Sequence, residues 1–122
     1  MPSFATLIRP HVDTELRAAV TAEARGDAAR AFSHLERAHV LGQPSTVQHV
    51  RVHWRMFRWG WRHGRLRECT GQLLRIVGAA TKTFAGLVPT GNTGGSNVSP
   101  FRPLPVAPEL EAILRRVRAQ AR

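Results

Sequence analysis

Hydrophobic positions recur three or four residues apart along the first 85 residues, which is the period of an amphipathic α-helix. Residues 13–25 carry a one-sided stripe of Leu16, Ala19, Val20 and Glu23. Gly26 and Asp27 then interrupt the pattern, and Asp is a preferred helix N-cap. The pattern resumes over residues 28–41 with an inner stripe of Ala31, Phe32, Leu35, Ala38 and His39. The first part of the chain is therefore predicted to form two consecutive helices.

Two further helices are predicted over residues 46–62 and 66–85. "LGQPST" separates the second helix from the third, and "HGR" separates the third from the fourth. Gly and Pro end helices, and Ser or Thr caps the next one. These elements predict an all-α fold in a single domain, residues 1–122.

The two helical hairpins resemble each other at an offset of 38 positions, which aligns Gly26 with Gly64. The offset also aligns Ala31 with Cys69, Leu35 with Leu73, and Ala38 with Ile76. The first hairpin resembles a tetratricopeptide unit, although it lacks the usual aromatic residue in its first helix. Two units are too few for a self-supporting array. We therefore predict a four-helix domain of two tetratricopeptide-like hairpins.

The composition changes after residue 85. "GLVPTGNTGGSNVSPFRPLPVAPE" is rich in Gly, Pro and Asn, which excludes long regular elements. Apolar residues spaced through residues 86–107 suggest an irregular strap laid over the helices. A short final helix is predicted over residues 108–119.

Three stripes run along the third helix when its residues are placed at about 100° intervals. Val50, Trp54, Phe57 and Trp61 form the stripe that we predict to face the core. A second stripe consists of Arg51, Arg55, Arg58 and Arg62, facing solvent or a partner. His49, His53 and Met56 form the third, at the edge of the core stripe.

The histidines make a candidate metal site, because two imidazoles at i and i+4 on one helix face can reach the same ion. His39 lies within the inner stripe of the preceding helix, and Glu23 lies on the apolar side of the first helix. Three imidazoles and a carboxylate suit Zn, Cu, Ni, Fe or Mn. His34, Glu36 and Cys69 are substitute ligands. The alternative is that the histidines are hydrogen-bonded packing residues.

The chain is strongly basic, with a net charge of +10. Clustered arginines attract acidic proteins or nucleic acid. Seventeen arginines against one lysine, Lys82, also match the codon bias of a GC-rich bacterial genome. The arginine stripe is therefore a candidate partner surface or an ordinary solvated face.

A membrane span and a secretory signal are not expected, since no run of eighteen apolar residues occurs and the apolar stretch near the N-terminus is short. The single cysteine cannot form an internal disulfide. These features favour a cytoplasmic protein, either a monomer or a homodimer.

Three segments together resemble a bacterial family of proteins of about this length that is catalogued only as a domain of unknown function. They are "AFSHLERAHVLGQ", "HVRVHW" and "GNTGGSNVSPFRPLP". The resemblance implies no reaction, but it draws attention to the histidines and to Asn92 and Asn97. We hypothesise that these asparagines belong to a lid over the histidine site.

Three functional classes follow from these features. The first is a small transition-metal-binding protein for storage, delivery or sensing. The second is a tetratricopeptide-like interaction module that binds an acidic protein or nucleic acid through its arginine face. The third is a metal-dependent enzyme, which would need an open coordination position and a general base. Whether the protein is an enzyme is left open, and the residues favour binding over catalysis.

Overall fold

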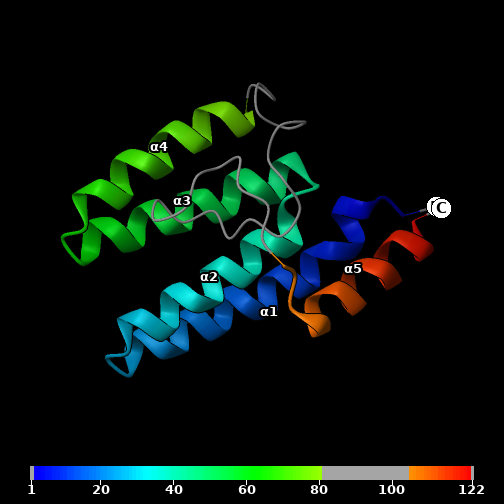
Figure 1. Cartoon of the computed structure of the whole chain (residues 1–122), viewed down its shortest axis with the longest axis horizontal. Coiled ribbons are helices and arrows are strands. Elements are labelled where there is room, and N and C mark those ends of the chain that lie inside the picture. The colour runs from blue at the N-terminus through cyan, green and yellow to red at the C-terminus, as the bar shows by residue number, and fades with distance from the viewer. Residues whose placement is uncertain (1, 81–104, 122) are drawn as a thin grey trace.

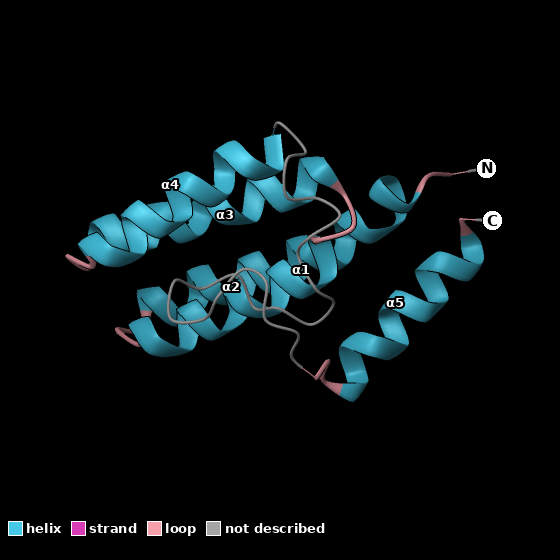
Figure 2. Ribbon diagram, turned by 45° about the horizontal axis from the view of Figure 1, so that its top comes forward, coloured by secondary structure: helices cyan, strands magenta, loops and turns pink. Residues whose placement is uncertain are grey.

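The computed structural model describes residues 2–80 and 105–121, and these residues form five helices and no strand. Helices α1 (Phe4–Ala24) and α2 (Ala28–Gly42) form one antiparallel hairpin, and α3 (Thr46–Arg62) and α4 (Leu66–Ala80) form another (Figure 1). Helix α5 (Pro108–Gln120) packs against α1 and α2 (Figure 2). The all-α prediction is confirmed.

The first helix is longer than its sequence pattern suggested. It begins at Phe4 instead of residue 13, with the Ser3 hydroxyl accepting a hydrogen bond from the Thr6 amide. Pro10 lies inside the helix and removes one of its backbone hydrogen bonds. The buried positions Ile8 and Val12 continue the stripe of Leu16 across the proline. Tertiary burial therefore compensates for the lost backbone hydrogen bond.

Short capped turns set the path of the chain between helices. Gly26 and Gly64 have φ angles of +81° and +67°, a conformation that glycine adopts without steric cost. Asp27 caps α2 by accepting from the Arg30 amide, and Ser45 caps α3 by accepting from the Gln48 amide. Both hairpins therefore turn at an equivalent glycine.

The core lies between the two hairpins and α5. Its members are buried apolar side chains from four helices, among them Ile8, Leu16, Leu35, Leu41, Val52, Met56, Leu114 and Val117. The two hairpins do not bury all of their aligned positions equally, because Leu35 is 3% exposed whereas the aligned Leu73 is 52% exposed. The second hairpin therefore leaves part of its apolar surface outside this core.

The predicted core stripe of α3 is wrong. Trp54 and Trp61 are 50% and 70% exposed, and Val50 and Phe57 are only partly buried. The buried face instead carries Gln48, His49, Val52, His53, Met56 and Trp59. Trp59 helps to determine which face of α3 is buried, because its indole N–H donates to the Ala28 carbonyl at 3.0 Å and its ring packs on Phe32. The histidines are thus central in the buried face rather than at its edge.

The predicted fourth helix extends to residue 85, and residues 81–85 and most of the predicted strap lie outside the described residues. Within the described part of the chain, no helix has the length and apolar character needed to cross a membrane.

Candidate metal centre

Three histidine side chains converge where the end of α2 meets the start of α3. The Nε2 atom of His39 lies 3.1 Å from that of His49 and 3.2 Å from that of His53. The Nε2 atoms of His49 and His53 are 2.9 Å apart. All three residues are buried, with exposures of 1%, 6% and 1% for His39, His49 and His53. The predicted grouping of these residues is therefore present in the structure.

The α2–α3 connection brings these helices close enough for the rings to meet. A Cβ atom on Gly42 would lie 3.0 Å from the Cβ of Gln48, so only glycine fits at this point without displacing α3. His49 follows in the first turn of α3, where its amide donates to the Ser45 carbonyl at 2.7 Å. His53 is one turn further on, on the same face. A close helix approach and an i, i+4 pair together build the cluster.

A chain of hydrogen bonds from α4 orients His53. The Gln72 amide nitrogen donates to the Glu68 carboxylate at 2.7 Å, so its oxygen must face His53, whose Nδ1 lies 2.5 Å away. A carbonyl oxygen only accepts, so Nδ1 of His53 carries the proton. In the neutral ring, Nε2 is then left with its lone pair directed into the cluster. Outer partners of this kind fix the tautomer of metal-binding histidines.

The two α3 histidines are neutral at pH 7. Burial lowers the pKa of His49 from 6.5 to about 4. Burial, followed by the charge of His49, lowers the pKa of His53 to about 3, and the hydrogen bond with Gln72 only partly opposes this. Neutral imidazole is the form that binds metal ions.

Glu23 does not join the histidines. Its carboxylate accepts two hydrogen bonds from Arg62, at 2.5 and 2.9 Å, and lies 3.6 Å from His63. These partners lower the pKa of Glu23, chiefly through the Arg62 hydrogen bonds. The partner that a carboxylate on this face requires is therefore an arginine of α3.

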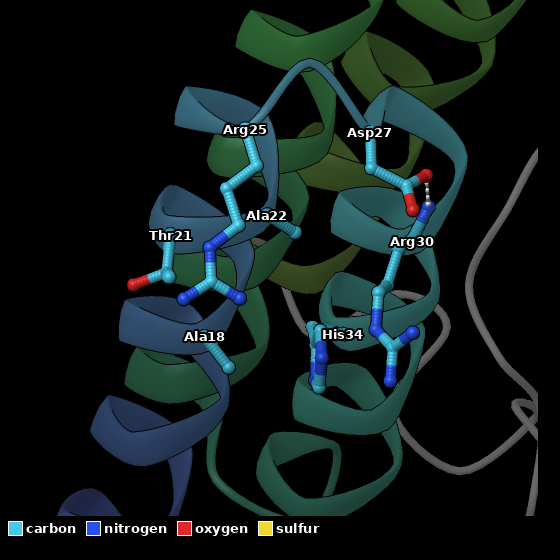
Figure 3. A pocket seen from close by; sticks show the side chains of 7 residues that line it. All are labelled: Ala18, Thr21, Ala22, Arg25, Asp27, Arg30 and His34. Atoms are coloured by element: carbon cyan, nitrogen blue, oxygen red, sulfur yellow. Dashed lines mark hydrogen bonds between the residues drawn. The ribbon is translucent and has the colours of Figure 1, made fainter.

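The substitute ligands also lie elsewhere. His34 hydrogen-bonds Glu15 through Nδ1 at 2.9 Å and lines a hollow between α1 and α2 (Figure 3). The buried Cys69 thiol faces the Phe57 carbonyl at 3.6 Å. Glu36 is partly buried on α2. Among the described residues, the group whose ligand atoms lie within 4.8 Å of one another contains His39, His49 and His53 alone. Asn92 and Asn97, the predicted lid, lie outside the described residues.

The arginine stripe is partly neutralised. Arg51 pairs with Asp13 at 2.6 Å, and Arg62 pairs with Glu23. Arg55 and Arg58 form no ion pair within residues 2–80 and 105–121. The stripe thus contains two structural arginines and two whose charge is not balanced by an ion pair.

Sequence reasoning missed Gln72 and Glu68. Gln72 is fully buried, and four of the next five residues in "LLRIV" are apolar. A polar side chain among apolar neighbours on a helix signals a buried hydrogen-bond partner, and its i, i+4 spacing from Glu68 indicates a fixed amide. That signal does not identify His53 as the partner, because the contact depends on how α3 packs on α4.

Comparison with known proteins gives a family but no described activity. No curated protein and no solved structure matches the chain. A family model described as "Protein of unknown function (DUF3703)" matches residues 6–114, a span that includes all three clustered histidines. The resemblance to a domain of unknown function is confirmed, and the chain belongs to the DUF3703 family.

Proposed function

We propose that this protein binds one transition-metal ion through the Nε2 atoms of His39, His49 and His53. The observation that carries the proposal is the convergence of three buried ring nitrogens at 2.9–3.2 Å from one another. Ligands about 2.0–2.1 Å from a metal ion are about 3.3 Å apart in a tetrahedral site and about 2.9 Å apart on an octahedral face. The nitrogen spacing lies between these limits.

Hydrogen bonding among the rings cannot account for the convergence by itself. The three Nε2 atoms form three contacts with one another. The Nε2 of His53 lacks a proton, so only the Nε2 atoms of His39 and His49 can donate hydrogen bonds in these contacts. If His39 and His49 both carried a proton on Nε2, their own 3.1 Å contact would bring two donors together. At least one contact is therefore repulsive, and a cation among the lone pairs would relieve it.

A proton is a poor candidate for that cation at neutral pH, since the pKa values of His49 and His53 are about 4 and about 3. Imidazole ligands suit Zn, Cu, Ni and Fe, whereas Mn prefers oxygen donors. The donor set therefore favours the first four ions.

Metal binding for storage, delivery or sensing fits these residues better than metal-dependent catalysis. Three protein ligands leave a coordination position open, as catalytic sites require. However, the described residues place no carboxylate or thiolate in the cluster that could act as a general base. The proposed role is therefore ion binding.

Metal analysis of protein purified without chelators tests this proposal. We expect about one equivalent of a transition metal in the wild type and loss of that metal in the His49→Ala, His53→Ala double variant. A His34→Ala, His63→Ala double variant is the matched control, because it removes two histidines outside the cluster. Equal metal content in both double variants would contradict the proposal.

A further inference from the structure

The exposed face of α3 carries a repeated pair of side chains. An aromatic residue is followed directly by an arginine three times, at Trp54-Arg55, Phe57-Arg58 and Trp61-Arg62. The aromatic rings form a ladder, with Trp54 stacked on Phe57 at 5.5 Å and Phe57 on Trp61 at 6.5 Å between ring centroids. The ladder spans two helical turns, about 10.5 Å. We call these six residues the aromatic–arginine face.

The rings of this face are open to solvent. Trp54 is half exposed and Trp61 is 70% exposed, which is unusual for the largest apolar side chain. Phe57, Arg58, Trp61 and Arg62 line a hollow of about 370 Å³. One planar ring can therefore lie against Trp61 with a guanidinium group beside it.

Positive charge accumulates along the same face. Burial and then the charges of Arg51, Arg58 and Arg62 lower the pKa of Arg55, with Glu23 opposing them. Arg55 and Arg58 also line a second hollow, of about 480 Å³, between α3 and α1. Since the only carboxylates paired with the arginine stripe among the described residues are Asp13 and Glu23, an anionic partner would relieve the remaining repulsion.

We propose that the aromatic–arginine face binds single-stranded nucleic acid. Every nucleobase offers a flat surface that stacks on tryptophan, and each nucleotide adds one phosphate for an arginine. The repeated aromatic-arginine pair presents these two interactions side by side. An acidic peptide would satisfy the arginines but would leave the exposed rings without a flat partner. The proposal is independent of the metal site, whose histidines lie on the buried face of α3.

Titration of metal-free, full-length protein with fluorescein-labelled dT15 tests this face. We expect a rise in anisotropy together with quenching of tryptophan emission. Trp61→Ala and Trp54→Ala should each weaken binding by about 5- to 150-fold, the effect of losing one base stack. Arg55→Gln with Arg58→Gln should weaken binding and lower the salt slope by about 1.4, or about 0.7 for each lost phosphate contact.

The matched control is Arg115→Gln with Arg116→Gln, on α5. These exposed arginines form no ion pair among the described residues, and replacing them removes the same charge from a helix that packs on α1 and α2 and not on α3. The control should retain most of the affinity. Circular dichroism and melting temperature establish that each variant folds.

Four outcomes would overturn the proposal. They are no binding of dT15 by the wild type, equal loss in the arginine control, full affinity in both tryptophan variants, and preference for another polyanion. The last is measured with phosphatidylserine vesicles and with poly-L-glutamate at matched charge. Tryptophan-independent binding to either of these would assign the face to a membrane surface or an acidic protein instead.

Discussion

At the residue scale, the proposed metal site depends on how His53 is held. The Glu68–Gln72–His53 chain directs one lone pair into the cluster before any ion arrives. Outer partners of ligating histidines typically change metal affinity by 10- to 100-fold when they are removed. The geometry therefore assigns Gln72 a positioning role in the proposed metal site.

Replacing Gln72 tests that role. Gln72→Leu should lower metal affinity by roughly 10- to 100-fold at unchanged stoichiometry, measured by competition with a chelator of known affinity. Gln48→Leu is the matched control, because Gln48 is also a buried glutamine but bonds Arg51 instead of a histidine. Equal affinity in the wild type and in both variants would remove Gln72 from the site.

The buried histidines also predict the pH dependence of metal-free protein. His49 and His53 bind protons more weakly in the folded chain than in the unfolded chain, where their pKa is 6.5. Unfolded protein therefore takes up more protons below pH 6.5, and the free energy of unfolding should fall between pH 6.5 and 5. The loss approaches about 1.4 kcal/mol per pH unit for each histidine once the pH is well below 6.5.

Urea unfolding in chelator at several pH values measures this loss. The window lies above the range in which carboxylates titrate, so ion pairs such as Arg62–Glu23 contribute little to the slope. The His49→Ala, His53→Ala variant, which lacks both buried rings, should lose most of this slope. A profile that is level from pH 7.5 to 5 would mean that the two rings are not buried as neutral groups.

The sequence was sufficient to identify the three histidines but not their surroundings. The i, i+4 spacing of His49 and His53 and the inward stripe of His39 depend on local periodicity alone. The assignment of Glu23 failed because its partner, Arg62, lies 39 positions away. Helical periodicity contains no information about which neighbouring helix a side chain meets.

At the element scale, the close approach of α2 and α3 determines whether the histidines meet. Gly42 lets the helices touch at Gln48, one residue before His49. Gly60 plays the same steric part between α3 and α4, where a Cβ would lie 3.1 Å from the Cys69 sulfur. Substitutions at these two glycines therefore distinguish an effect on the histidine cluster from a general effect on helix packing.

Gly42→Ala should lower both stability and metal affinity. The added methyl group must displace Gln48 and the start of α3, at a cost of about 1–3 kcal/mol, partly offset by the better helix propensity of Ala. Gly60→Ala should lower stability while leaving metal affinity near that of the wild type. Chemical denaturation and metal competition measure the two quantities. Unchanged metal affinity in Gly42→Ala would show that the α2–α3 contact does not position the rings.

Helix periodicity predicted the elements better than their faces. The extension of α1 across Pro10 and the rotated buried face of α3 share one cause, which is burial against other helices. Trp54, Phe57 and Trp61 in the "WRMFRWGW" segment suggested a core stripe. The tryptophan that is buried is instead Trp59, which contacts Ala28 and Phe32. The other two tryptophans are left on the surface that we assign to nucleic acid.

At the scale of the whole molecule, the cluster lies at the junction between the two hairpins. His39 belongs to the first hairpin and His49 and His53 to the second, so an ion held by all three would link them. Helix α5 covers the first hairpin through Leu114 and Leu110, and its Glu109 pairs with Arg37 of α2 at 2.7 Å. A metal ion would thus stabilise the junction that α5 does not cover.

Metal binding should therefore stabilise the whole fold. A ligand at one hundred times its dissociation constant adds about 2.7 kcal/mol to the free energy of unfolding. Thermal denaturation with and without Zn²⁺ should show a higher melting temperature that a chelator reverses. The His49→Ala, His53→Ala variant should show no such rise. A wild-type melting temperature that is indifferent to every candidate ion would count against the site.

Anomalous X-ray diffraction from crystals grown with Zn²⁺ would test the central claim most directly. We expect one strong peak, about 2.0–2.1 Å from the Nε2 atoms of His39, His49 and His53. A peak elsewhere on the chain, or three rings joined by hydrogen bonds with no peak between them, would contradict it.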